Sequence, residues 1–283
     1  MRGPAIIART LSAANVTDAR GHGWQYHSRS DHHSKVACWA VLFDLLQTSS
    51  LMQRHVAEGK VAFGINRRIN DWTSGRKKDL DLVVARTAGA HDEQLQAFDL
   101  ADLAVRYHLN LDATDQAILA DLPTAPQGPS GSTVLVALEA KACMTAHIKA
   151  LPRLYDELTS SHATVHGDNA NALAVGFVMV NLAETFLSPG KQTTVDPVVT
   201  VHNQPNDTVR TVAKMHEIAR RSGPHSGQHG FDALGVVVVD LRNDGTPVTI
   251  VTGAPAPAPT DDFHYDRMVV RAGHLYDSSF GQV

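Results

Sequence analysis

The chain has 283 residues, of which 43% are hydrophobic and 19% charged, and its formal net charge is −4. This composition is typical of a folded globular protein with one large domain or two small ones, and the net charge does not indicate a general nucleic-acid binder. No segment approaches the ~18 apolar residues that cross a bilayer, and the amino-terminal segment lacks a signal-peptide core, so we expect a cytoplasmic protein with no membrane partner.

The first half of the chain predicts a helix followed by strands. Residues 1–28 show little periodicity and are expected to form a loosely ordered amino-terminal arm. From Ser30 an apolar run predicts a helix packed on both sides, and Ser30 or Asp31 is a suitable cap. Strands are expected over 60–66 and 79–86, separated by a loop or a hairpin arm.

An insert is expected over residues 87–132, with helical spacing in its first half and a Pro/Gly/Ser-rich end. A buried strand (133–142), a helix (144–161) and another buried strand (172–183) follow. The order over 31–183 is helix, three strands, helix, strand, which predicts an α/β fold with a mixed central sheet flanked by helices. We therefore expect a core over 29–206.

Residues 207–283 are expected to form a carboxy-terminal extension that serves recognition or dimerisation. The extension contains a predicted helix (207–221), a hairpin turning near Asn243 to Gly245 and a terminal helix (263–280). His225 and His229 have a spacing that could hold zinc, although a plain loop or a DNA-reading loop fits equally. Cys38 and Cys143 lie in apolar contexts, so both are expected to be reduced, buried thiols.

Residues 134–144, VLVALEAKACM, place two opposite charges within an apolar strand. Because side chains alternate across a strand, Glu139 and Lys141 share one face, and Asp79 and Asp81 share a face of the preceding strand. If the strands are neighbours, the carboxylates and the ammonium converge at the edge of the sheet. Buried charges must be paired or bind an ion, and such carboxylates suit Mg²⁺. The alternatives are an exposed charged pair at 139 and 141, and a strand start paired to nearby lysines at 79 and 81.

The sequence DLDLVV followed by ALEAKA resembles the PD-(D/E)xK nuclease superfamily, which includes many restriction endonucleases. The resemblance implies an αβββαβ core and a metal held by Asp81, Glu139 and the main-chain carbonyl of Ala140, with Lys141 beside them and Asp79 as the other register. Mg²⁺ is the expected ion and Mn²⁺ a possible substitute. An additional acid from the first helix would be Glu58 or Asp44, of which Glu58 is slightly better placed. The chain departs from the pattern because no proline precedes the aspartate and because 57 residues separate Asp81 from Glu139.

Several polar side chains flank these motifs and are candidate phosphate contacts. They are Arg29, Ser34, Lys35, Arg76, Lys77, Lys78, His147 and Arg153. A helix cap explains residues 28–35 equally well, and solvated surfaces explain the others.

Together, these features predict a Mg²⁺-dependent DNA endonuclease of the type II restriction kind. Two subunits would be needed to cut both strands of a symmetric site in double-stranded DNA, so a homodimer is expected. The alternatives are a structure- or end-directed repair nuclease of the same superfamily and an inactive nucleic-acid-binding protein on the same fold.

Overall fold

The computed structural model describes residues 1–71, 75–87, 98–128, 133–189 and 196–283. Its centre is a six-stranded sheet with the spatial order β10 (Thr249–Val251), β9 (Ala233–Asp240), β6 (Leu173–Asn181), β5 (Val134–Cys143), β4 (Arg76–Arg86), β3 (Val61–Asp71). The described residues also form eight helices: α1 (Gly3–Leu11), α2 (His32–Thr48), α3 (Ser50–Ala57), α4 (Leu100–Arg106), α5 (Ala113–Asp121), α6 (His147–Asp168), α7 (Asn206–Met215), α8 (Tyr265–Ser279). The described residues also contain two small two-stranded sheets: β1 (Val16–Thr17) with β2 (Gly23–Trp24), and β7 (Thr185–Ser188) with β8 (Val198–Val201).

The central sheet is mixed, as expected. β5, β6 and β9 are parallel neighbours, whereas β3–β4, β4–β5 and β9–β10 are antiparallel. The predicted order of helix, three strands, helix and strand is confirmed as α2, β3, β4, β5, α6 and β6, with α3, α4 and α5 as additional helices. The protein is therefore an α/β protein with helices on both faces of a mixed sheet.

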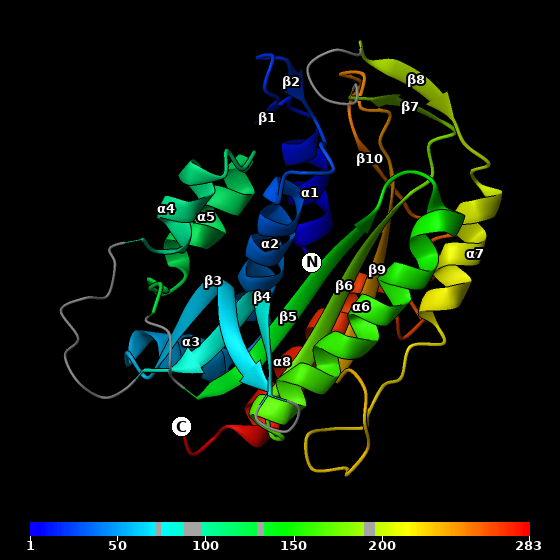
Figure 1. Cartoon of the computed structure of the whole chain (residues 1–283). Helices are drawn as coiled ribbons and strands as arrows, with labels where there is room; N and C mark the ends of the chain where they lie inside the picture. Colours follow the sequence, from blue (N-terminus) through cyan, green and yellow to red (C-terminus); the bar gives the residue numbers. More distant parts are fainter. Residues whose placement is uncertain (72–74, 88–97, 129–132, 190–195) are drawn as a thin grey trace.

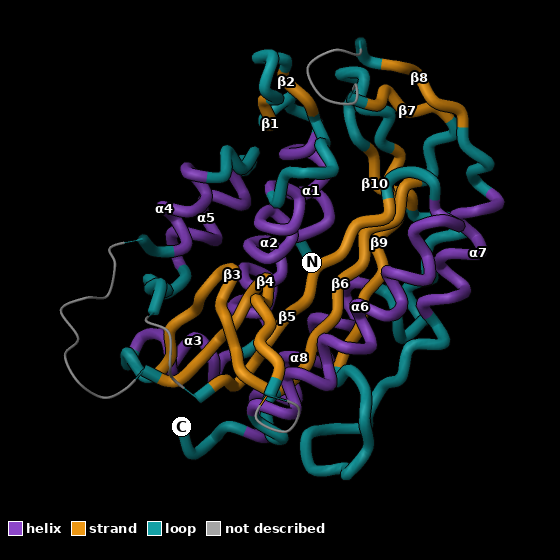
Figure 2. Tube along the Cα trace, viewed as in Figure 1, coloured by secondary structure: helices purple, strands orange, loops and turns teal. Residues whose placement is uncertain are grey.

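Helices cover the two faces of the sheet unequally (Figures 1 and 2). One apolar cluster joins α1, α2, α3 and α8 to the sheet, and a second joins α6 and α7 to the opposite face. Every residue of β6 is buried, because a strand covered on both faces has no polar side. None of the described helices is long and apolar enough to cross a membrane.

The prediction of a loosely ordered amino-terminal arm is wrong for residues 3–11, which form α1. Ile6, Ile7 and Leu11 are completely buried against α2, a helical spacing that the short segment did not make obvious. Asp44 accepts hydrogen bonds from the amides of Arg2 (2.9 Å) and Gly3 (2.8 Å), and so neutralises free N–H groups at the start of α1.

Residues 207–283 complete the central sheet. β9 pairs with β6, and β10 returns antiparallel to β9 through a connection in which Asn243 (φ 61°) and Gly245 (φ 91°) have left-handed backbones, so the predicted hairpin is confirmed. The predicted terminal helix is also confirmed as α8, which packs on β9 and α2. The segment expected as an extension therefore contributes to the same sheet as β5.

Candidate active site

The candidate site lies where β4 and β5 separate. Their antiparallel ladder runs from Ala85↔Val134 to Leu82↔Leu138 and ends there within the described strands, although β4 begins at Arg76 and β5 continues to Cys143. The β3–β4 ladder continues to the end of the hairpin. The far half of this hairpin therefore leaves β5 and reaches toward α6 (Figure 1).

A backbone irregularity accompanies the separation. Ile65 pairs with Leu82 and Arg67 with Leu80, but Asn66 between them has a left-handed φ of 53°. Leu82 packs in the cluster on the α2 face, whereas Leu80 packs in the cluster on the α6 face, so strict alternation is broken across Asp81. Irregularities of this kind turn a strand and re-aim its side chains.

Asp81 fills the gap between the parted strands. Its Oδ2 accepts a hydrogen bond of 2.8 Å from the amide of Ala140, which has lost its partner on β4. Burial raises the pKa of Asp81 to about 6, and the negative charge of Glu139 adds to the rise. In an extended strand the N–H and C=O of one residue face the same neighbour, so the Ala140 carbonyl faces this gap as well.

Glu139 and Lys141 share the face of β5 that α6 covers, as the alternation predicted. Glu139 is only 2% exposed, and its Oε1 lies 2.6 Å from Nζ of Lys141 and 3.4 Å from Nζ of Lys78. Its Oε2 is buried and has no hydrogen-bond partner among the described residues. A buried carboxylate oxygen without a partner is costly, so this atom is the least satisfied group of the cluster.

Helix α6 supplies the outer wall of the cluster. Glu157 lies 3.5 Å from Nζ of Lys141 and 2.6 Å from Nε of Arg153. Lys78 donates to the hydroxyl of Ser161 and to the carbonyl of Glu157. Burial lowers the pKa of Lys141, but the nearby charges of Glu139 and Asp81 more than offset this, and the pKa lies above its usual value. Lys141 is therefore a charged ammonium.

Three of the predicted acids do not join the cluster. Asp79 is exposed and forms a bidentate ion pair with Arg68 (2.8 and 2.9 Å), which lowers the pKa of Asp79. Of the two aspartates, Asp81 is therefore the one that lies at the gap. Glu58 is exposed beside Lys60 (2.9 Å), next to the opposite end of β3. Asp44 caps α1.

The predicted phosphate contacts lie in different environments. His147 is 1% exposed, with Nε2 2.8 Å from the Asn181 carbonyl, and Ser34 is buried and bonds to the Asp31 carbonyl, so both belong to the interior. Lys35 pairs with Asp31 at 2.9 Å, and Lys78 belongs to the cluster. Arg29, Lys77 and Arg153 are exposed. The side chain of Arg76 lies outside the described residues.

Sequence reasoning missed Glu157 and His33, and it gave Lys78 only the role of a candidate phosphate contact. Lys78 joins the cluster because alternation breaks at Leu80, and this break could not be read from the sequence. Glu157 stands in the middle of an ordinary amphipathic helix and carried no signal. His33 packs against Tyr26 at a ring distance of 5.0 Å, and burial, with a smaller contribution from the charge of Lys141, lowers its pKa to about 4.

The residues at the gap fit a hard divalent cation. Within the described ranges, no three His, Cys, Asp or Glu side chains group closely enough to hold a metal by themselves. Mg²⁺, however, needs only one or two carboxylates and keeps several waters. Asp81 and Glu139 supply two carboxylates, the Ala140 carbonyl faces the same gap, and a cation there would satisfy Glu139 Oε2 and offset the repulsion that raises the pKa of Asp81.

His225 and His229 are exposed, and neither forms part of a metal cluster with other described residues. Cys38 and Cys143 are free and buried, as expected.

Comparison with known proteins adds no family to this geometry. No family model matches the chain, and no curated protein and no solved structure gives a significant match.

Proposed function

We propose that the protein is a Mg²⁺-dependent DNA endonuclease with the active-site arrangement of the PD-(D/E)xK superfamily, of the type II restriction kind. The observation that carries the proposal is the separation of β4 from β5 at Leu82↔Leu138, directly beside Asp81 and Glu139. This separation opens one gap toward which a carboxylate from each strand, the backbone of Ala140 and the ammonium of Lys141 converge.

Asp81, Glu139 and the Ala140 carbonyl would hold the metal. When bound, Mg²⁺ would lower the pKa of a water and neutralise phosphate charge. Lys141 is charged and 25% exposed, so its ammonium can orient an attacking water and offset charge that develops on phosphate oxygens. Glu157, which is itself paired with Arg153, holds the outer side of Lys141 in place.

Double-stranded DNA is the proposed substrate. The exposed cations Arg29, Lys77 and Arg153 are the side chains best placed to contact its phosphates. Cutting both strands of a symmetric site requires two such active sites, so we propose a homodimer.

A second candidate is a nucleic-acid-binding protein without catalysis. The observation in its favour is that Glu139 is already neutralised by Lys78 and Lys141, so that part of its ligand capacity is occupied by ammonium groups. A repair nuclease of the same superfamily uses the same site and differs only in substrate preference.

Cleavage of a large unmethylated duplex DNA by the purified protein separates these functions. The assay compares Mg²⁺, EDTA and the Lys141→Ala variant, with Lys60→Ala as a control for loss of an exposed lysine on the same protein. Discrete Mg²⁺-dependent bands that disappear in Lys141→Ala support the restriction-type enzyme, and a Mg²⁺-dependent smear supports the repair-type enzyme. DNA binding without cleavage, indifferent to Mg²⁺ and to Lys141→Ala, would contradict the nuclease.

A further inference from the structure

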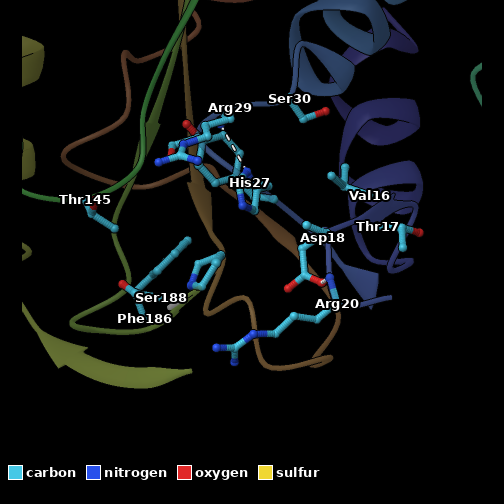
Figure 3. A pocket seen from close by; sticks show the side chains of 14 residues that line it. Val16, Thr17, Asp18, Arg20, His27, Arg29, Ser30, Thr145, Phe186 and Ser188 are labelled. Carbon is cyan, nitrogen blue, oxygen red and sulfur yellow. Dashed lines mark hydrogen bonds between the residues drawn. The ribbon is translucent and has the colours of Figure 1, made fainter. Parts of the chain in front are cut away.

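A pocket with both polar and apolar lining opens beyond the carboxy-terminal end of β5 (Figure 3). Its volume is about 870 Å³, within the ~300–1,000 Å³ of small-molecule sites. Four separate parts of the chain line it, namely 16–20, 26–30, Thr145 after β5, and Phe186, Ser188 and Pro189 in and after β7. Elements distant in the sequence therefore enclose one concave surface.

The lining combines cations, hydroxyls and an aromatic ring. Arg20, His27 and Arg29 lie around the pocket (Figure 3), and Ser28, Ser30, Thr145 and Ser188 also line it. Within the described part of the chain no carboxylate pairs with the Arg29 guanidinium, and Arg20 has only the fully exposed Asp196 at 3.6 Å. Two guanidinium groups with so little compensation form a site for an anion such as phosphate.

The one carboxylate in the lining is held by hydrogen bonds from its own segment, and the two guanidinium groups outnumber its charge. Asp18 accepts hydrogen bonds from the amides of Arg20 (2.8 Å) and His22 (3.0 Å) and from the indole of Trp24 (2.9 Å). The hydrogen bond from Trp24 contributes most to lowering the pKa of Asp18 to about 2. Asp18 thus orders the turn from which Arg20 projects.

Tyr26 gives the pocket an aromatic wall. Its ring packs against His33 at 5.0 Å and edge-on against the buried Phe186 at 6.2 Å, so it is held from two sides while remaining half-buried. Every nucleobase has a π face that stacks on such a ring, and arginine binds the attached phosphate. An aromatic wall combined with guanidinium groups therefore matches a nucleotide better than a bare anion.

The pocket is close to the candidate active site. Thr145 follows Lys141 by four residues, at most about 14 Å away for an extended chain. Nucleotides of one DNA strand rise about 3.4 Å each, so a strand with its reacting phosphate at Lys141 reaches the pocket within a few nucleotides.

We propose that this pocket binds one nucleotide of the substrate DNA, turned out of the duplex near the cleaved bond. Its phosphate would lie against Arg20 and Arg29 and its base against Tyr26. The concave shape requires a base that has left the stack, as in enzymes that extrude a nucleotide. This inference rests on the proposed nuclease function for the identity of the strand, but nucleotide binding itself is independent of cleavage.

The test is calorimetric titration of the full-length protein with each of the four deoxynucleoside 5′-monophosphates, with inorganic phosphate and with a deoxynucleoside as separate probes. We expect one site per chain that binds a monophosphate, with phosphate and deoxynucleoside at least tenfold weaker. Arg20→Ala and Arg29→Ala should each weaken binding by about tenfold or more, since each removes a charge-assisted contact. Arg54→Ala, an exposed arginine on α3, is the matched control and should bind as the unaltered protein does.

Two results would overturn the proposal. The first is absence of monophosphate binding, or binding equal in Arg20→Ala, Arg29→Ala and Arg54→Ala. The second is phosphate binding as tight as that of the monophosphates, which would leave no role for a base.

A duplex that carries 2-aminopurine tests extrusion separately. Its fluorescence should rise on protein binding at one position and should not rise with Arg29→Ala. Unchanged emission at every position would contradict extrusion. Arginine-dependent monophosphate binding in a protein that cuts no DNA would support the nucleotide site and contradict the proposed nuclease function. DNA cleavage without monophosphate binding would contradict the nucleotide site alone.

Discussion

Two buried ionic groups of the molecule differ in how completely they are satisfied. At one, Arg221 (4% exposed) holds both oxygens of Asp232 (0% exposed) at 2.8 and 2.9 Å. Asp232 also accepts from the amide of Ala174 (2.8 Å), and Arg221 donates to two carbonyls. At the other, in the gap between β4 and β5, Glu139 leaves one buried oxygen without a partner, and Asp81 carries a raised pKa.

The difference separates a structural ion pair from a site prepared for a ligand. A buried ion pair whose polar atoms all have hydrogen-bond partners has a structural role, and loss of one partner leaves an unpaired buried charge. A cluster with an unused oxygen and repelling carboxylates is less stable than it could be, and a bound cation would relieve both defects.

The largest effect is expected at Glu139. Glu139→Gln removes the charge and a metal ligand at nearly constant shape, and the rate of Mg²⁺-dependent DNA cleavage should fall by about a thousandfold or more, since each ~1.4 kcal/mol of lost barrier reduction is tenfold. Asp232→Asn, assayed under conditions in which it stays folded, should cut at nearly the normal rate. A Glu139→Gln rate within a few-fold of normal would place the chemistry elsewhere.

For the free energy of unfolding, the largest effect is expected at Asp232. Asp232→Asn leaves Arg221 buried without its counter-charge, so the free energy of unfolding should fall by roughly 3–5 kcal/mol in urea titrations. Asp240→Asn is the control, because its partner Arg242 lies 3.6 Å away at the surface and its effect should be much smaller. Equal effects from the two variants would mean that the buried pair is not held as described.

Substitution of Asp81 should change the free energy of unfolding in the opposite direction to substitution of Asp232. An acid whose pKa is higher in the folded state than in the unfolded state destabilises the fold at a pH where the acid is ionised in both states. This cost disappears as the pH falls below the pKa of the acid in the unfolded chain, near 4. With a folded pKa of about 6, Asp81→Asn should stabilise the metal-free protein at pH 8 by roughly 1–2 kcal/mol, after loss of its hydrogen bond to Ala140. Asp79→Asn should leave the unfolding free energy nearly unchanged. Destabilisation by Asp81→Asn would show that its charge is compensated in the fold.

The smallest effect concerns pH. Mg²⁺ needs Asp81 deprotonated, so its affinity should be constant well above pH 6 and fall by about tenfold per unit below it. Titrations of the ion at pH 5, 6, 7 and 8 would measure this. Constant affinity over that range would contradict a metal ligand Asp81 whose pKa is raised to about 6.

Sequence patterns captured the parts of the fold that depend on local periodicity. The apolar flanks of Glu139 and Lys141 identified β5, and alternation correctly placed both charges on one face. The order of core elements followed from the same signals. Membership of residues 207–283 in the central sheet did not, because the pairing of β6 with β9 joins segments far apart in the chain and leaves no local trace.

The candidate site was only partly predictable for a related reason. Lys78 reaches Glu139 because the hairpin leaves β5 and alternation fails between Leu80 and Leu82, an irregularity centred on Asn66. His147 looked like a surface residue at a helix start, yet its ring is buried against the Asn181 carbonyl. Both outcomes depend on tertiary packing that overrides local patterns.

The metal site between β4 and β5 can be tested by binding of the divalent cation itself. Calorimetric titration of Mn²⁺ and Mg²⁺ into the unaltered protein, Glu139→Gln and Asp79→Asn at pH 7.5 requires no knowledge of the DNA sequence recognised. We predict one site per chain that is lost in Glu139→Gln and retained in Asp79→Asn. Absence of binding in the unaltered protein, or equal binding in Glu139→Gln, would contradict a metal site between β4 and β5.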